Sequence, residues 1–172
     1  CFPKDVKALI KTADKYGYSM SVLKAVESVN EKQKTVLFEK LYNYYEGNLK
    51  GKTIALWGLA FKPETDDMRE ATSLVTIKLL LKEGCKVVVY DPIAMQECMR
   101  RIGEVVTYAN NMYDCVFNAD ALLLLTEWKI FRLPKWNVLK ERMVVPLLID
   151  GRNLYDHNEV ISNGIIYMSI GS

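Results

Sequence analysis

The sequence predicts an α/β fold in which a helical segment precedes an open parallel sheet with helices on both faces. Four short segments, starting near residues 53, 86, 121 and 147, are almost continuously apolar. Strands that are buried on both faces of a parallel sheet have this composition. Helical patterns separate these segments, and such alternation of strand and helix is typical of parallel sheets. With 50% apolar residues among 172, the chain can bury a core.

The first 48 residues are predicted to be helical. Residues 4–16 have a helical pattern that ends before Gly17. Between residues 19 and 45 apolar side chains recur at spacings of three and four, which predicts one amphipathic helix of about 27 residues. Because that helix would be longer than most, we expect it to bridge two domains or to form the interface of a homodimer.

The remainder of the chain is predicted to form the sheet domain. Strands are expected at residues 53–57, 86–90, 105–108, 121–125, 147–149 and 165–168, and helices at 73–83, 94–101, 111–118, 128–142 and 157–162. The helix at 128–142 is expected to be irregular. We therefore expect two domains, residues 1–48 and residues 49–172.

Composition argues against several classes of function. The net charge of +2 gives no electrostatic basis for binding nucleic acid or an anionic membrane. The longest strongly apolar run, Ala121–Leu125, is far shorter than the about 20 residues of a membrane span. Four cysteines without a C-x-x-C pair, and a single histidine, predict neither a zinc site nor a disulfide framework. No basic and then apolar leader opens the chain, so we expect a cytoplasmic protein.

The loops that follow the strands are the candidate ligand site, because ligands of open α/β sheets bind beyond the carboxyl ends of the strands. The first of these loops is longer than usual and has one glycine where the dinucleotide fingerprint needs three. Lys62 and Arg69 in this loop, together with Arg152, would place three cations at one edge, enough to bind a diphosphate. The alternative is that each is a solvated loop charge.

Asp91 follows the second predicted strand directly. An acidic residue at this place holds the ribose in dinucleotide-binding folds. However, Pro92 comes next, and Asp-Pro often starts a turn. A structural turn is therefore the favoured interpretation, and ribose binding is the alternative.

Cys1 is a candidate nucleophile, since it precedes a helix start that carries Lys4 and Asp5. A cation or the amino end of a helix lowers the pKa of a nearby thiol and so favours the reactive thiolate. The other three cysteines lie in or beside apolar patterns and are predicted to be core residues: Cys85, Cys98 and Cys115.

Six motifs, taken in order, resemble those of the nucleotide-sugar dehydrogenases. They are Cys1–Asp5, Gly58–Glu70, Tyr90–Pro92, Leu125–Trp128, Asp150–Tyr155 and Tyr167–Gly171. The resemblance covers the whole chain and is strongest to the enzymes that act on UDP-glucose. It implies a long dimer-forming helix followed by a Rossmann-like domain that binds the UDP-sugar. It also implies an amino-terminal NAD-binding domain, which is absent from this sequence.

The resemblance implies an NAD-dependent enzyme that oxidises UDP-glucose to UDP-glucuronate in two hydride transfers. In such an enzyme Cys1 would form a thiohemiacetal and then a thioester, and Asp5 would handle a proton or position the hydrolytic water. Lys4 and Arg69 would contact the NAD cofactor. Further catalytic groups of the family have no counterpart in this sequence, so the chain alone is expected to be inactive.

The resemblance also assigns the binding of the nucleotide sugar to Phe61, Lys62 and Arg152. The chain departs from the family's pattern at Ser172, where arginine is common. The alternatives within the family are a GDP-mannose or a UDP-N-acetylmannosamine dehydrogenase. Outside the family, the alternatives are a dimerisation module without a ligand and a flavodoxin-like regulatory domain, whose clustered acids would be Asp66 and Asp67.

Overall fold

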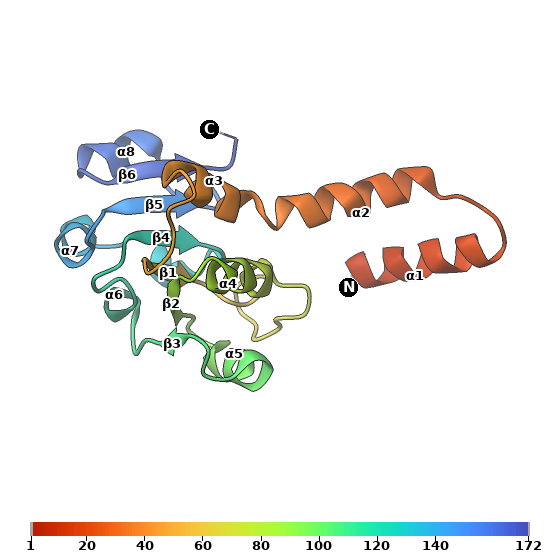
Figure 1. Ribbon diagram of the computed structural model, residues 1–172, viewed down its shortest axis with the longest axis horizontal. Helices are drawn as coiled ribbons and strands as arrows, with labels where there is room; N and C mark the ends of the chain where they lie inside the picture. The colour runs from red at the N-terminus through yellow and green to blue at the C-terminus, as the bar shows by residue number, and fades with distance from the viewer. Residues whose placement is uncertain (1, 172) are drawn as a thin grey trace. The chain divides into compact units, whose positions relative to one another are not determined.

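The computed structural model describes the backbone of residues 2–171 and the side chains of residues 5–171 (Figure 1). The chain divides into two compact units, residues 1–36 and residues 37–172, which we call the helical unit and the sheet unit. Within the described part of the chain, no helix has both the length and the apolar character needed to cross a membrane.

The helical unit is a pair of helices, α1 (Phe2–Lys15) and α2 (Ser21–Gln33). Among residues 5–36 only the side chain of Ile10 is buried. Ion pairs join the two helices: the ammonium of Lys7 lies 3.6 Å from the carboxylate of Glu27, and that of Lys24 lies 2.7 Å from that of Asp14. Charge pairing therefore contributes to the contact between α1 and α2, while few apolar side chains are covered there.

The expected single helix over residues 19–45 is wrong. α2 ends at Gln33, a turn covers residues 34–35, and α3 (Val36–Tyr44) follows. The turn has a local cause at Thr35, whose backbone N–H and side-chain hydroxyl both donate to the carbonyl of Lys32, at 3.0 and 2.8 Å. A hydroxyl that bonds to a nearby carbonyl competes with the regular hydrogen bonds of a helix.

α3 belongs to the sheet unit. Its Leu37 and Leu41 are buried in the core beside the first strand, whereas α2 buries no side chain. The boundary between the two compact units therefore lies after Val36, twelve residues before the boundary that we expected at residue 48.

The sheet unit contains six parallel strands, as predicted. They are β1 (Thr53–Trp57), β2 (Lys86–Tyr90), β3 (Thr107–Tyr108), β4 (Ala121–Leu124), β5 (Leu147–Asp150) and β6 (Ile166–Ser169). Their order in the sheet is β3-β2-β1-β4-β5-β6. The chain thus builds outward from β1 in one direction and then, from β4 on, in the other. The change of direction occurs between β1 and β4.

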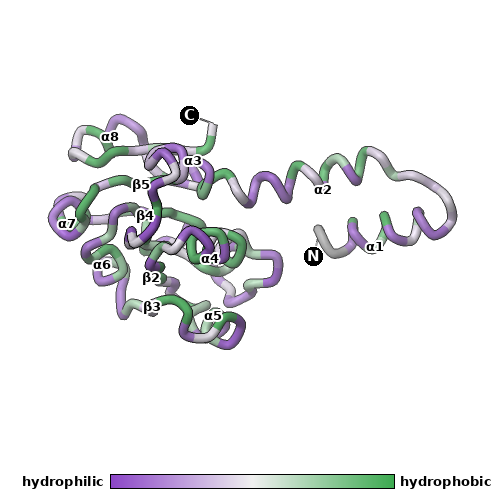
Figure 2. The backbone as a smooth tube through the Cα atoms, viewed as in Figure 1, coloured by the Kyte–Doolittle hydropathy of each residue, from purple (hydrophilic) through white to green (hydrophobic). Residues whose placement is uncertain are grey.

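Helices cover both faces of the sheet because the strands are apolar on both sides. On one face Ile54 and Leu56 of β1 pack in the core with α3, α4 (Thr72–Lys82) and α5 (Met95–Ile102). On the other face Ala55 and Trp57 pack with a second set of helices: α6 (Met112–Cys115), the 3-10 helix η1 (Lys129–Phe131), α7 (Trp136–Arg142) and α8 (His157–Ser162). Figure 2 shows hydrophobic stretches at β5 and α4 of the sheet unit, while hydrophilic and hydrophobic stretches alternate along α1 and α2. Pro134 separates η1 from α7 and accounts for the irregular helix predicted at 128–142.

Candidate functional site

The loops after β1, β4 and β5 meet at one edge of the sheet, because the carboxyl ends of parallel strands share an edge. At the change of direction, the first loop is in close contact with the loop after β4. Gly58 has φ of +88°, and a Cβ atom added to it would lie 2.5 Å from the Cβ of Thr126. Only glycine permits this approach, so Gly58 allows the two loops to pack directly against each other.

The backbone of residues 59–61, which begins the first loop, is hydrogen-bonded at every N–H and C=O group. The two N–H groups of Leu59 and Ala60 donate to one carboxylate oxygen of Asp91, at 2.6 and 3.2 Å. The Ser73 hydroxyl donates to the carbonyl of Leu59, and the Thr126 hydroxyl donates to the carbonyl of Ala60. The backbone N–H of Phe61 donates to the carbonyl of Asp67, and the Arg152 guanidinium donates to the carbonyl of Phe61. Side chains from several other segments therefore fix the start of this loop.

Asp91 follows β2 and ties its own loop to the loops after β1 and β4. Its carboxylate is buried and also accepts hydrogen bonds from the backbone N–H groups of Ile93 and Ala94, at 2.9 and 2.8 Å, and from the indole N–H of Trp128, at 3.0 Å. Five donors of the chain therefore occupy this carboxylate. The structural turn that the sequence favoured is observed, and the oxygens that a ribose would need are engaged.

This edge does not fit a dinucleotide bound in the manner of dinucleotide-binding folds. In those folds the backbone N–H groups after the first strand face the pyrophosphate, and an acid after the second strand holds the ribose. Here the N–H groups of Leu59 and Ala60 donate to Asp91 instead. The two features that would bind the dinucleotide bind each other.

Arg152 links the loops after β1, β4 and β5. Its Nε donates to the carbonyl of Leu125 at 2.7 Å, and its Nη2 donates to the carbonyl of Phe61 at 3.3 Å. The same Nε lies 3.0 Å from Oε2 of Glu127. The Lys62 ammonium lies 5.5 Å from the centre of the exposed Phe61 ring. The structure thus places Arg152 against the backbone of Phe61, the residue before Lys62, and Arg152 is more than a solvated loop charge.

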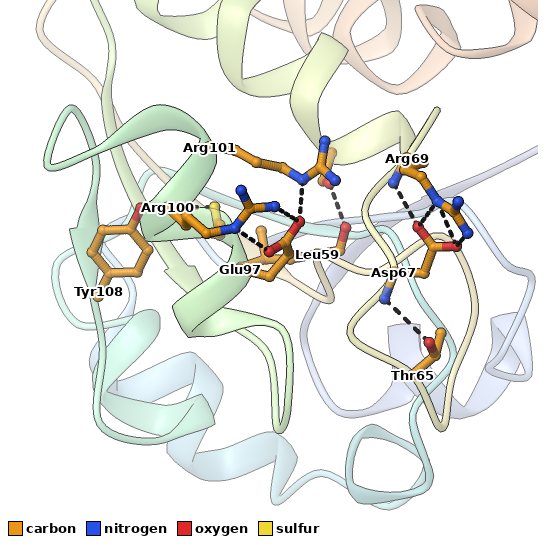
Figure 3. Close-up of polar contacts among 10 residues, drawn as sticks. Leu59, Thr65, Asp67, Arg69, Glu97, Arg100, Arg101 and Tyr108 are labelled. Atoms are coloured by element: carbon orange, nitrogen blue, oxygen red, sulfur yellow. Dashed lines mark hydrogen bonds and ion pairs between the residues drawn. The ribbon is translucent and has the colours of Figure 1, made fainter.

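Arg69 lies in the same loop but already has an anionic partner. Its Nε and Nη2 donate to the two carboxylate oxygens of Asp67, at 2.9 and 2.7 Å (Figure 3). These hydrogen bonds hold the pKa of Asp67 below its usual range. The three expected cations are therefore not equivalent, because the charge of Arg69 is paired with a bidentate carboxylate. The pairing also engages Asp67, one of the two acids that a regulatory domain would need in a cluster.

The structure shows further residues that sequence reasoning missed. Asp150, at the end of β5, is buried and accepts hydrogen bonds from the backbone N–H of Arg152 at 2.8 Å and from the Tyr167 hydroxyl at 2.8 Å. The contact of Glu127 with Arg152 was also missed. Asp150 is the last residue of β5, and Glu127 lies three residues after the end of β4. Both acids thus stand at the carboxyl ends of buried strands, and that placement was the signal in the sequence. Within the described part of the chain, no group of three or more His, Cys, Asp or Glu side chains could hold a metal ion.

The residues expected to carry the chemistry are described only in part. Asp5 is exposed in the first turn of α1, while Cys1 and the side chain of Lys4 lie outside the described residues. The other three cysteines are buried, which confirms their prediction as core residues. Burial raises the pKa of the Cys85 thiol to about 11 and also raises the pKa values of Cys98 and Cys115. These three thiols are poor nucleophiles at neutral pH.

Fold and edge together define a doubly wound, Rossmann-like α/β domain of the class that binds ligands at the carboxyl ends of its strands. The UDP binding domain of the UDP-glucose/GDP-mannose dehydrogenase family matches residues 55–157, and the central domain of that family matches residues 1–32. The chain belongs to the UDP-glucose/GDP-mannose dehydrogenase family.

Individual relatives agree with this assignment. The chain is 48% identical over 176 residues to a UDP-glucose 6-dehydrogenase of Pseudomonas aeruginosa, with 99% of the chain and 39% of the relative covered. It is 41% identical to the UDP-glucose 6-dehydrogenase TuaD of Bacillus subtilis, covering 99% of the chain and 37% of that protein. The solved structure of a UDP-glucose dehydrogenase from Pyrobaculum islandicum superposes with a TM-score of 0.84 at 31% identity, covering 98% of this chain and 36% of that one. The chain thus spans less than half the length of these relatives.

Proposed function

We propose that the chain is part of an NAD-dependent nucleotide-sugar dehydrogenase that oxidises UDP-glucose to UDP-glucuronate, and that the sheet unit binds the UDP part of the substrate. The observation that carries the proposal is the meeting of Phe61, Lys62 and Arg152 at the carboxyl edge, beside the change of strand direction. The relatives named as UDP-glucose 6-dehydrogenases support UDP-glucose over the alternatives, GDP-mannose and UDP-N-acetylmannosamine.

Each of the three residues suits one part of a nucleotide sugar. The Lys62 ammonium and the Arg152 guanidinium supply charge-assisted hydrogen bonds to phosphate oxygens. The Phe61 ring offers an exposed apolar surface next to them. Because the backbone of residues 59–61 is already hydrogen-bonded, recognition falls to side chains rather than to backbone N–H groups.

The chemical step is proposed for residues near the start of the chain. Cys1 adds as a thiolate to the C6 aldehyde, and the thiohemiacetal becomes a thioester that water hydrolyses to the carboxylate and free thiol. Asp5 takes up or delivers a proton, or orients the hydrolytic water. NAD, when bound, accepts the hydride of each oxidation. Lys4 and Arg69 are the residues of this chain proposed to contact NAD. The start of the loop after β1, residues 59–61, does not fit a dinucleotide and is proposed to bind the sugar nucleotide instead.

We also propose that the protein is a homodimer that uses α2. The apolar side chains of Val22, Val26 and Val29 follow one another at spacings of four and three residues and are all exposed. A helix that buries none of its own apolar stripe gains stability when a second copy covers it.

A titration followed by chemical shifts tests the proposed binding of UDP. We expect UDP to bind the 172-residue chain with a dissociation constant of about 1 mM, and to shift resonances of Lys62 and Arg152. Uridine and NAD are expected to bind more weakly than UDP. Equal binding of uridine would show that the diphosphate is not recognised, and shifts centred on Asp91 and Cys98 would misplace the site.

A matched pair of lysine variants locates the charge that UDP uses. Lys62→Ala should weaken UDP binding by less than tenfold, because the ammonium is exposed and screened by solvent. Lys86→Ala is the control, since Lys86 is an exposed lysine at the start of β2, on the opposite edge of the sheet. An equal loss of UDP affinity in the two variants would mean that only the net charge of the protein matters and that Lys62 does not contact UDP.

A further inference from the structure

The contact between Arg152 and Glu127 has an unusual geometry. The Nε atom of Arg152 carries one hydrogen, which points to the carbonyl of Leu125 at 2.7 Å. Oε2 of Glu127 lies 3.0 Å from the same nitrogen but has no hydrogen-bond partner among the described residues, although that oxygen is buried. Glu127 therefore neutralises the charge of Arg152 without a hydrogen bond between them.

The pair formed by Arg69 and Asp67, in the same region, differs because its guanidinium and carboxylate are hydrogen-bonded to each other. There the guanidinium donates to both carboxylate oxygens, and the backbone N–H of Arg69 adds a further hydrogen bond at 2.9 Å. Bidentate, hydrogen-bonded pairs are the stronger kind of arginine–carboxylate contact. Arg152 is therefore the arginine whose carboxylate partner is more easily replaced by another anion.

The position of Arg152 does not depend on Glu127. Two carbonyl oxygens, those of Leu125 and Phe61, accept hydrogen bonds from its guanidinium and come from two different loops. Its side chain and that of Glu127 are each 33% exposed, so solvent reaches part of both side chains although Oε2 of Glu127 is buried. If the carboxylate turned away, the guanidinium would keep its place and regain an uncompensated positive charge.

We propose that Glu127 is an internal counter-ion of Arg152, which the diphosphate of the ligand displaces when it binds. The inference rests on the proposed binding of UDP and adds a residue that tunes it. Because the ligand must compete with a carboxylate already in place, Glu127 weakens the binding of diphosphates and favours ligands with more negative charge than its own. A purely structural role of Glu127 predicts the reverse, since its loss would then only weaken binding.

Calorimetric titration of the 172-residue chain tests this, with Glu127→Gln as the variant and UDP and inorganic pyrophosphate as probes. Glutamine keeps the shape of the side chain and removes the charge. We expect UDP to bind about three- to tenfold more tightly to the variant, with a steeper loss of affinity as salt is added. Glu64→Gln is the control: Glu64 is an exposed acid of the first loop whose carboxylate lies 3.9 Å from Lys129 instead. It should leave binding unchanged.

The outcomes separate the inference from the proposed function. If wild type binds UDP and Glu127→Gln binds it equally or more weakly, the counter-ion role is wrong and the binding of UDP stands. If the variant binds UDP and pyrophosphate more tightly than wild type but equally to each other, the counter-ion role holds and recognition of the nucleoside fails. Binding of UDP by neither protein overturns both.

The wild-type protein gives a second readout, which does not depend on the folding of the variant. On saturation with UDP, the carboxyl carbon resonance of Glu127 should move toward the value of a carboxylate in water. A resonance of Glu127 that stays in place while those of Lys62 and Arg152 shift would contradict displacement.

Discussion

The helical unit and the sheet unit treat the same kind of side chain in opposite ways. In α2 the valines of the apolar stripe are exposed, with Val22 at 77% and Val29 at 62%. In β1 the side chains of Ile54 and Leu56 are completely buried. By sequence α2 is amphipathic and β1 is apolar. The difference in exposure therefore depends on which other elements cover each segment.

The difference shows that a periodic pattern predicts a face but not the layer that covers it. In the sheet unit two layers of helices cover the strands, and the chain buries its own apolar surface. In the helical unit two helices face each other with ion pairs between them, and most apolar side chains stay exposed. The stability of the helical unit should therefore depend on partners, and that of the sheet unit on its own core.

The largest effect is expected from Asp91→Ala. The change leaves five N–H groups without their acceptor, of which those of Leu59 and Ala60 begin the first loop. Each buried unsatisfied donor is costly, so the free energy of unfolding of the sheet unit should fall by about 4 kcal/mol. Urea unfolding followed by tryptophan fluorescence measures this, because all three tryptophans lie in the sheet unit: Trp57, Trp128 and Trp136.

Asp66→Asn is the control for this variant, since Asp66 is an exposed acid of the same loop. Its unfolding midpoint should match that of wild type. A loss for Asp91→Ala no larger than for Asp66→Asn would mean that the first loop is held without Asp91.

The next effect compares the two helices on either side of the boundary between the units. Leu41→Ala in α3 removes a fully buried side chain and should lower the free energy of unfolding by about 2–5 kcal/mol. Val29→Ala in α2 removes a side chain that is exposed in the single chain, and at concentrations where the protein is monomeric it should change this free energy by less than about 0.5 kcal/mol. Similar losses in the two variants would show that α2 is covered as fully as α3.

Much of the sheet unit could be predicted from sequence because its strands carry their own signal. The apolar runs ending at Trp57, Tyr90 and Leu125 lie within one residue of the observed strands, since continuous burial leaves an unbroken apolar segment. The turn at residues 34–35 left no such signal: the hydroxyl of Thr35 ends α2 by a local hydrogen bond, while the apolar spacing continues through it.

The residues of the candidate site could be predicted from the sequence, but the hydrogen bonds between them could not. Lys62 and Arg152 follow strand ends, where charges are visible in the sequence. That Arg152 contacts the carbonyl of Phe61, 91 residues away, depends on strand order, which the sequence does not state directly. The hydrogen bonds of Asp91 to the first loop escaped prediction for the same reason.

A charge placed on the exposed stripe of α2 tests the proposed homodimer. Val29→Asp should weaken self-association at least tenfold, about 1.4 kcal/mol, because the interface would have to bury a carboxylate. Asn30→Asp adds the same charge at the next exposed position of the helix, beside the stripe, and should have a smaller effect. Sedimentation over a range of concentrations measures both, and a wild-type monomer at tens of micromolar would contradict the proposed dimer.

The smallest effect is expected from an exposed ion-pair cluster, even within the sheet unit. On α5, Glu97 accepts hydrogen bonds from Arg100 and Arg101, and chiefly the bond from Arg100 lowers the pKa of Glu97 from 4.5 to about 2 (Figure 3). Because the folded state holds the carboxylate in its charged form, the cluster stabilises the fold fully above pH 4.5. This contribution is lost as the pH falls through about 2. The urea midpoint of wild type should therefore exceed that of Glu97→Gln slightly at pH 6, and the gap should narrow as the pH is lowered from 4.5 toward 2. A gap that stays the same from pH 6 to pH 2 would mean that Glu97 stabilises α5 by packing rather than by charge, which would place it with the buried side chains of the sheet unit.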